Sequence, residues 1–183
     1  MYTKGSTVRS TMDYIAHALD DVERAGVLAR LDPEDRRLIL EVDAIAEVPY
    51  RVVLALWRSI DKVLGPRDPQ WAERAGAEAI EVTGMQLYPE LIARSTPLEW
   101  INQYVSLFQL YYRPGDMIKV DEGPHRITTR LVGFDDQDPL FCRRLVGGFL
   151  AAIRLARGRD VSVRHTRCVH EGDLFCEWES SWR

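Results

Sequence analysis

The sequence has no long hydrophobic run and no excess of positive charge, and these two absences exclude broad classes of function. No stretch reaches the ~20 apolar residues of a transmembrane helix, and no signal-peptide-like run lies at the N-terminus. The formal net charge is -4, so the chain lacks the basic surface typical of nucleic-acid-binding proteins. We therefore expect a cytoplasmic protein that binds neither a membrane nor nucleic acid.

Motifs of the common enzyme classes are also absent. The sequence contains no G-x-S-x-G, Walker loop, dinucleotide fingerprint or H-E-x-x-H. The nucleophilic hydrolase, phosphate-binding and zincin interpretations therefore have no support. We do not expect an enzyme, although catalysis that uses none of these motifs stays open.

Cysteine is scarce, and all three cysteines lie between Asp138 and Trp182. An odd number of cysteines fits a reducing compartment better than a disulfide framework. Asp138 followed by Pro139 predicts the start of a helix, whose apolar residues recur three and four positions apart. Alternating residues on either side of a turn at 171–173 then predict a β-hairpin.

Gly147 and Gly148 lie in the middle of this predicted helix. A glycine inside a helix costs about 1 kcal/mol relative to alanine. A closely packed neighbour is therefore expected at this point of the helix.

The predicted helix and hairpin bring the three thiols together. His165 lies three residues before Cys168 and offers a fourth ligand, and Cys₃His is a common closed tetrahedral zinc site. Residues three apart on a regular strand face opposite sides, so this set requires a bulge or an early strand end. Such ligands suit zinc or iron, and we predict a structural zinc. The predicted metal ligands are Cys142, His165, Cys168 and Cys176.

Two other interpretations of the cysteines stay open. A free cysteine often serves as a small buried hydrophobic residue. Cys168 and Cys176 also suit a regulatory thiol pair, although only the neighbouring arginines would favour a thiolate there.

The spacing of the cysteines resembles that of the 4-vinyl reductase domain family. Twenty-five residues separate Cys142 from Cys168, seven separate Cys168 from Cys176, and a Gly-Asp turn lies in the second interval. The match is strongest to sensory domains of bacterial phenol-responsive activators, and the last third is similar to a myxobacterial family of uncharacterised proteins. The resemblance implies a structural zinc beside a small-molecule pocket, in a homodimer. The family's fourth ligand is acidic, and His165 replaces it here.

The chain before residue 113 is mostly helical by its hydrophobic periodicity. Helices are predicted at about 10–26, 32–48, 49–65 and 68–83. Thr96 and Glu99 then form a capping-box pattern that starts a further helix.

This further helix is unusually rich in aromatic residues. An aromatic stripe is by default core packing, because each ring buries a large area. Several tyrosines on one helix also suit a pocket for an apolar or aromatic ligand, since buried hydroxyls need partners. Both interpretations stay open. The candidate pocket residues are Trp100, Tyr104, Phe108, Tyr111, Tyr112 and Phe134.

After a turn at 113–116 the period changes from helical to alternating, which predicts a hairpin over 117–134. The order of elements predicts an α+β fold: N-terminal helices packed with a small antiparallel sheet of two hairpins and a C-terminal helix between them. We expect a single domain over 1–183, with a mostly helical part (1–113) and a strand-helix-strand part (114–183) that carries the Cys/His cluster.

These features favour a non-enzymatic regulatory or sensory domain. It would hold a structural zinc, bind a hydrophobic or aromatic small molecule, and signal to a partner protein as a homodimer. A ligand-free scaffold or protein-interaction module is the alternative. A reductase-type enzyme or an enzyme-assembly subunit is the third interpretation, and it depends on the family name alone.

Overall fold

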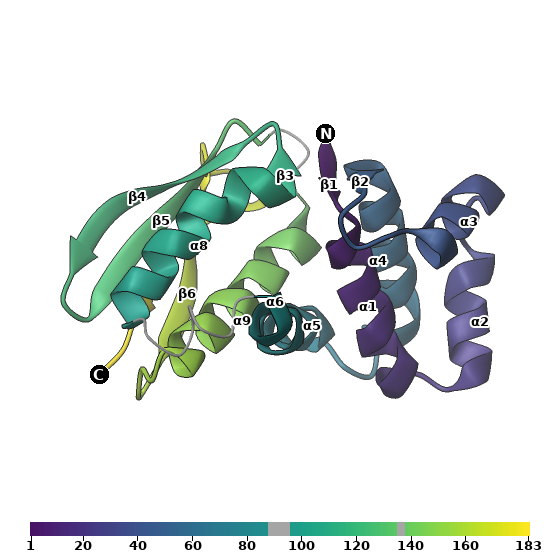
Figure 1. The fold of residues 1–183 in the computed structure, drawn as a ribbon, viewed down its shortest axis with the longest axis horizontal. Coiled ribbons are helices and arrows are strands. Elements are labelled where there is room, and N and C mark those ends of the chain that lie inside the picture. The colour runs from purple at the N-terminus through teal and green to yellow at the C-terminus, as the bar shows by residue number, and fades with distance from the viewer. Residues whose placement is uncertain (88–95, 135–137) are drawn as a thin grey trace.

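The computed structural model describes residues 1–87, 96–134 and 138–183. Helices α1 to α4 form one side of the elongated molecule, and a four-stranded sheet with α8 and α9 forms the other (Figure 1). Helix α5 lies between the two sides and contacts both α1 and α9. The helices are α1 (Gly5–Ala18), α2 (Asp21–Ala29), α3 (Pro33–Glu41), α4 (Tyr50–Leu64), α5 (Trp71–Glu78), α6 (Met85–Leu87), α8 (Pro97–Tyr111) and α9 (Pro139–Leu155), with a π-helical segment η1 (Ala79–Gly84) and a 3-10 segment η2 (Val169–Glu171).

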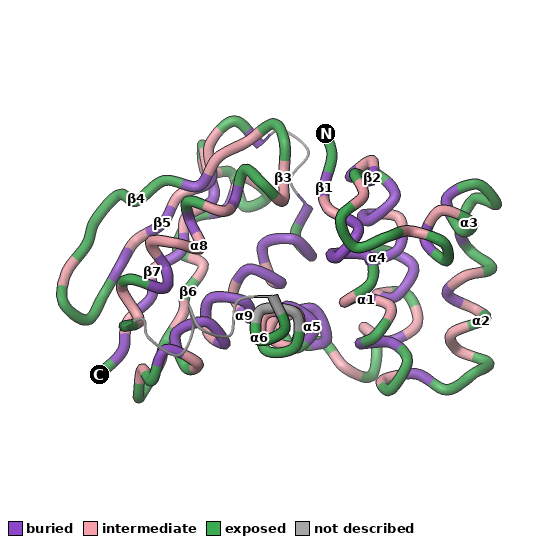
Figure 2. Tube along the Cα trace, viewed as in Figure 1, coloured by how far each residue is buried: buried purple, intermediate pink, exposed green. Residues whose placement is uncertain are grey.

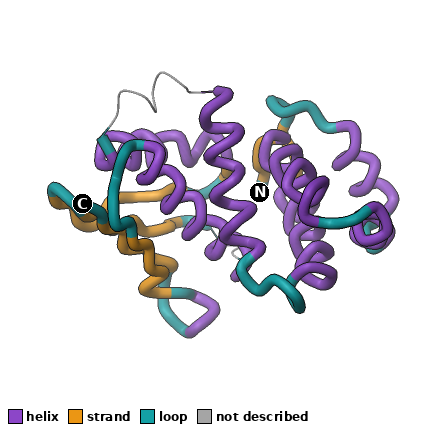
Figure 3. Tube along the Cα trace, turned by 90° about the horizontal axis from the view of Figure 1, so that it is seen from below, coloured by secondary structure: helices purple, strands orange, loops and turns teal. Residues whose placement is uncertain are grey.

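Two antiparallel sheets complete the described fold, which confirms the α+β class (Figure 3). The larger sheet has the strand order β4-β5-β7-β6, with β4 at Asp116–Gly123, β5 at Arg126–Val132, β6 at Ser162–Arg167 and β7 at Cys176–Ser181. The smaller sheet has the order β2-β1-β3, formed by Tyr2–Lys4 (β1), Glu47–Pro49 (β2) and Tyr112–Arg113 (β3).

The predicted helix starts at Asp32, Thr96 and Asp138 are confirmed. The Asp138 side chain accepts a hydrogen bond from the Leu140 N–H at 2.9 Å, and Asp32 accepts one from Glu34 at 2.9 Å. Thr96 forms the predicted capping box with Glu99. In each case a side-chain oxygen satisfies a backbone N–H that the first helical turn leaves unpaired.

The predicted continuous helix over 10–26 is wrong, because the chain breaks at Leu19 and Asp20. Asp20 caps a new helix, α2, through a capping box with Glu23. The helix predicted to reach Pro49 ends at Glu41, because residues 47–49 pair with β1 as a strand. The N-terminal residues 2–4, for which the sequence analysis predicts no element, are the central strand of the smaller sheet.

Helix α9 is buried along most of its length (Figure 2). It contacts α5 and α8 as well as strands β6 and β7. Gly147 explains how α5 approaches so closely: a Cβ there would lie 1.8 Å from the backbone oxygen of Glu73. The close neighbour expected at the helix glycines is therefore α5.

None of the helices in the described part of the chain is both long and apolar enough to cross a bilayer.

Candidate functional site

The predicted metal ligands lie together where α9 meets β6 and β7. Cys142 is in the first turn of α9, His165 is on β6, Cys168 follows β6 and Cys176 is the first residue of β7. One ligand atom from each of the four residues lies within 4.8 Å of all the others. The Sγ atoms of Cys142 and Cys176 are 3.6 Å apart. With metal–sulfur bonds of about 2.3 Å, a tetrahedral site has sulfur–sulfur edges of about 3.8 Å, so this spacing suits a shared cation.

An irregularity in β6 lets His165 and Cys168 reach the same side of the sheet. The β6–β7 register shifts between His165 and Arg167, which is the bulge that the cluster requires. The His165 ring stacks on Trp178, with centroids 4.7 Å apart and planes at 10°. Its Nε2 is buried and has no hydrogen-bond partner among the described residues. Asp173 accepts a hydrogen bond from the Cys168 N–H at 2.8 Å and so holds the following turn.

The three thiols differ in their electrostatic environments. The hydrogen bond with the Cys142 thiol is the largest cause that lowers the pKa of Cys176, and the neighbouring His165 lowers this pKa further. The same hydrogen bond and burial raise the pKa of Cys142, and burial raises that of Cys168. The shared hydrogen bond therefore favours the thiolate form at Cys176 over the thiolate form at Cys142. A bound cation would stabilise all three as thiolates, because the thiolate is the form that ligates a metal.

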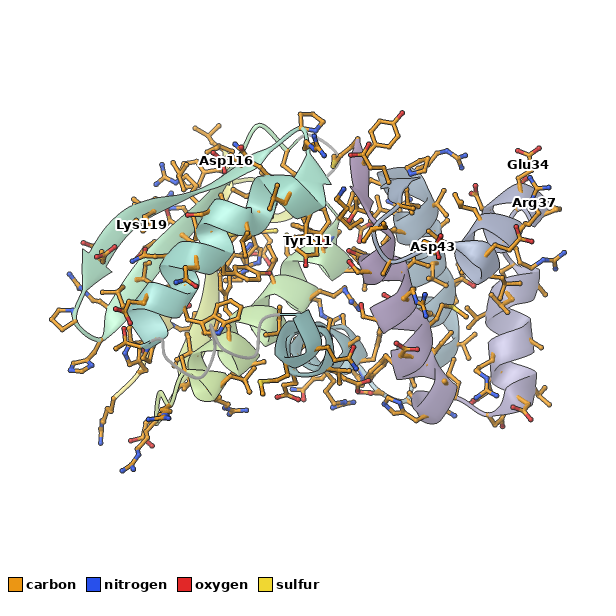
Figure 4. The ribbon with its side chains drawn as sticks, in the orientation of Figure 1. Glu34, Arg37, Asp43, Tyr111, Asp116 and Lys119 are labelled. Carbon is orange, nitrogen blue, oxygen red and sulfur yellow. The ribbon has the colours of Figure 1, made fainter. Side chains whose placement is uncertain are left out.

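A second candidate site is a cavity of about 120 Å³ between α1, α5, η1, α8 and α9. It is not fully enclosed. Figure 4 places Tyr111, one of its lining residues, near the middle of the molecule between α8 and the helical side. Of the candidate pocket residues, those that line it are Trp100, Tyr104, Phe108, Tyr111 and Tyr112. Phe134 is not among the described lining residues, and it stacks on Phe141 with centroids 4.8 Å apart.

Arg144 is the charged residue in the described lining of the cavity, and it was not among the predicted pocket residues. It follows Phe141 by three positions and precedes Gly148 by four, so helical spacing places it on the buried face of α9. Only 7% of its surface is exposed, and its Nη1 has no hydrogen-bond partner among the described residues. The guanidinium carbon lies 4.6 Å from the centroid of the Trp57 ring. Burial lowers the pKa of Arg144, because desolvation disfavours the charged form.

No protein-family model matches this sequence, and no curated protein matches it. Solved structures do match, over nearly the whole chain. The Fe(II) unliganded H-NOX protein from K. algicida has a TM-score of 0.74 at 10% identity, covering 98% of this chain and 96% of that one. The S. oneidensis H-NOX protein in the Fe(II)NO state has a TM-score of 0.72 at 13% identity, covering 98% and 99%. This chain has the H-NOX fold. An NMR structure of an S. oneidensis H-NOX domain in the Fe(II)CO state agrees, with a TM-score of 0.70 at 14% identity and coverage of 98% of both chains.

The comparison overturns the resemblance to the 4-vinyl reductase family. That resemblance depended on the spacing of three cysteines and one turn, which describe only a helix and a hairpin. The H-NOX likeness covers the N-terminal helices as well. A local cysteine pattern specifies how one cluster assembles and says little about the remaining fold, which is why the family assignment was wrong.

The comparison also corrects the predicted cofactor. A structural zinc was expected as the cofactor of this domain. Several solved structures with this fold are described by an Fe(II) state, and two others concern distortion of the heme or its porphyrin. The prediction of a structural zinc, which came with the family assignment, is therefore wrong as well.

Proposed function

We propose that this chain is a non-enzymatic ligand-binding domain that signals to a partner protein. The observation that carries the proposal is the cavity beside α8, whose aromatic wall includes Trp100, Tyr104 and Phe108. A dry cavity of about 150 Å³ holds a benzene molecule, so about 120 Å³ suits a ligand with one small ring or a short apolar body. The S. oneidensis structures with this fold also bind small ligands, but their NO and CO are ligands of Fe(II) and bind differently from the ligand proposed here.

Heme does not fit this cavity. The described lining contains no histidine, cysteine or methionine, and residues 88–95 contain none in the sequence. Tyrosinate is the other common heme ligand, but burial raises the pKa values of Tyr104 and Tyr112 and keeps them neutral. A porphyrin, with its four linked rings, also needs far more room than the volume of about 120 Å³.

The four histidines lie away from the cavity. His165 belongs to the cysteine cluster, and His17 pairs with Glu78 at 3.0 Å. His125 lies between β4 and β5, and His170 is in η2. The function proposed here therefore does not involve heme.

We further propose that Cys142, His165, Cys168 and Cys176 hold one thiophilic metal ion. The proximity of their ligand atoms and the unpartnered Nε2 of His165 support this assignment. Four protein ligands leave no open coordination position, so the ion would be structural and would tie α9 to the hairpin of β6 and β7.

Helix α9 connects the two sites. Arg144 and Leu145 line the cavity, and Cys142 in the preceding turn belongs to the cluster. A ligand that favours one position of α9 would therefore shift the sheet as well, and a partner protein or a second copy of this chain would read that shift. Size-exclusion chromatography with light scattering measures the molar mass in solution and so tests the prediction that two copies of the chain form a homodimer.

Thermal melting with small aromatic probes tests the proposed function. We expect toluene, phenol or benzoate to raise the melting temperature, because a ligand that binds only the folded state stabilises it. Leu107 lines the cavity, whereas Leu110 on the same helix is 54% exposed. Leu107→Trp should abolish the shift, and Leu110→Trp should retain it. If no probe shifts the wild-type protein, the ligand-free scaffold becomes the better interpretation.

A further inference from the structure

Arg144 places a buried positive charge at the cavity, and no residue in the described part of the chain is its counterion. Its Nη1 is the unpartnered atom, and among the described residues it forms no ion pair. Nearby arginines differ in this respect: Arg143 pairs with Glu73 at 2.7 Å and Arg58 with Asp138 at 2.8 Å. The carboxylates of Glu73 and Asp138 are therefore already engaged.

An unpaired buried guanidinium is costly, because it has lost its hydration and gained little in return. The Trp57 ring compensates only in part, since a cation–π contact is weaker than the hydration that the guanidinium has lost. Trp100, which also lines the cavity, has a buried Nε1–H without a described partner. The buried Oε1 of Gln103 is likewise unpartnered, but it is an acceptor and would not bind a carboxylate. The aromatic cavity thus offers two N–H donors, at Arg144 and Trp100, that nothing in the described protein satisfies.

We propose that the cavity binds a small aromatic carboxylate, an inference that rests on the proposed function. Its carboxylate would accept hydrogen bonds from the Arg144 guanidinium, and its ring would pack against Trp100, Tyr104 and Phe108. Arginine suits this task, because its N–H groups match a carboxylate in geometry and charge. The ligand would supply the counterion that α9 lacks, so binding would act directly on this helix.

Benzoate and benzamide are matched probes for this inference, since they share size and shape and differ in charge. Titrations followed by calorimetry should show that the wild-type protein binds benzoate at least about tenfold more tightly than benzamide, as expected for a hydrogen bond to a charged group. Arg144→Met should remove this preference. Arg144→Lys keeps the charge and should restore part of it. Arg154→Met on the same helix, at an exposed arginine, is the control and should leave the preference unchanged.

The outcomes separate the inference from the proposed function. If benzamide binds the wild-type protein as tightly as benzoate, water satisfies Arg144 and the inference is overturned, while the cavity remains a binding site. If Arg144→Met keeps the preference for benzoate, another group binds the anion and the inference is again wrong. If neither probe, nor toluene, nor phenol binds, the proposed function fails too. Should Arg144→Met not fold, the wild-type comparison of benzoate with benzamide and the Arg144→Lys variant still decide the question.

Discussion

Gly147 of α9 lies against the backbone of Glu73 in α5, so closely that a Cβ on the glycine would be 1.8 Å from the Glu73 carbonyl oxygen. Gly76 makes the reciprocal contact, since its Cβ would lie 2.0 Å from the carbonyl oxygen of Arg144. The two helices therefore touch through backbone atoms. Because this contact positions Arg144 and Leu145 at the cavity, which Gly76 itself also lines, the shape of the cavity depends on these two glycines.

Adjacent glycines in α9 should respond to alanine in opposite ways. Gly147→Ala forces α5 and α9 apart and should lower the free energy of unfolding by about 2 kcal/mol or more, as overpacked cores do. At Gly148 a Cβ meets its nearest atoms, in Ile80 and Tyr104, at 3.6 Å, an ordinary contact. Gly148→Ala should therefore raise the free energy of unfolding by up to about 1 kcal/mol through helix propensity. Urea denaturation measures both, and equal effects would contradict the packing described.

The cap of α8 should contribute measurably to stability. Thr96→Ala removes the side chain that accepts the Glu99 N–H and should cost about 1 kcal/mol in urea denaturation. Ser106→Ala is the control, because this exposed serine on the same helix bonds only a backbone carbonyl. A cost no larger than that of the control would show that the capping box does not stabilise the helix.

Stability at acid pH should depend on Glu99. Hydrogen bonds from the Thr96 backbone and hydroxyl lower the pKa of Glu99. Its contribution is therefore present above the ordinary glutamate pKa and is lost as the pH falls through the lowered value. Glu99→Gln should therefore reduce the fall in the free energy of unfolding between neutral and acid pH. Below the lowered pKa of Glu99, the variant should have nearly the same pH dependence as the wild-type protein. An unchanged profile would mean that the bonds do not favour the charged form.

Asp138 should contribute through both its cap and its ion pair. It accepts the Leu140 N–H at the start of α9 and pairs with Arg58, whose side chain is largely exposed. Asp138→Ala removes both interactions and should cost about 2 kcal/mol, whereas Asp138→Asn keeps the cap and should cost less. A double-mutant cycle with Arg58→Ala isolates the ion pair. Equal costs for alanine and asparagine would show that the cap contributes nothing.

The cysteine cluster should bind metal and couple it to folding. Elemental analysis of the purified protein should find about one thiophilic metal ion per chain, and Cys176→Ser should lose it. The variant should melt roughly 5 to 10 °C lower, and a chelator should lower the wild-type melting temperature but not that of the variant. Leu174→Ser, at an exposed position of the same hairpin, is the control. A metal-free wild-type protein, unaffected by chelator, would leave the cysteines as core or redox residues.

Several elements of the fold follow from local sequence signals. A side-chain cap needs only neighbouring residues, so Asp32, Thr96 and Asp138 identify their helices without knowledge of the tertiary structure. The Asp20–Glu23 capping box is just as local, but the apolar stripe of α1 continues through it and hides the break. The bulge in β6 was inferred from a geometric requirement of the cluster, and the shifted register after His165 provides it.

The sequence by itself determined the capped helices, the α+β class and the identity of the residues that gather at the cluster. Only the tertiary structure decided the smaller sheet, since its strands pair residues 2–4 with residues near 48 and 112, and such short strands carry no periodicity of their own. It also decided the surroundings of Arg144: helical spacing indicates the buried face, whereas a missing counterion depends on which side chains α1, α4, α5 and α8 bring to that point. For the same reason the whole-chain fold overturned the predicted family and the predicted cofactor. A short motif reports local geometry, and the cavity is formed by segments far apart in the chain.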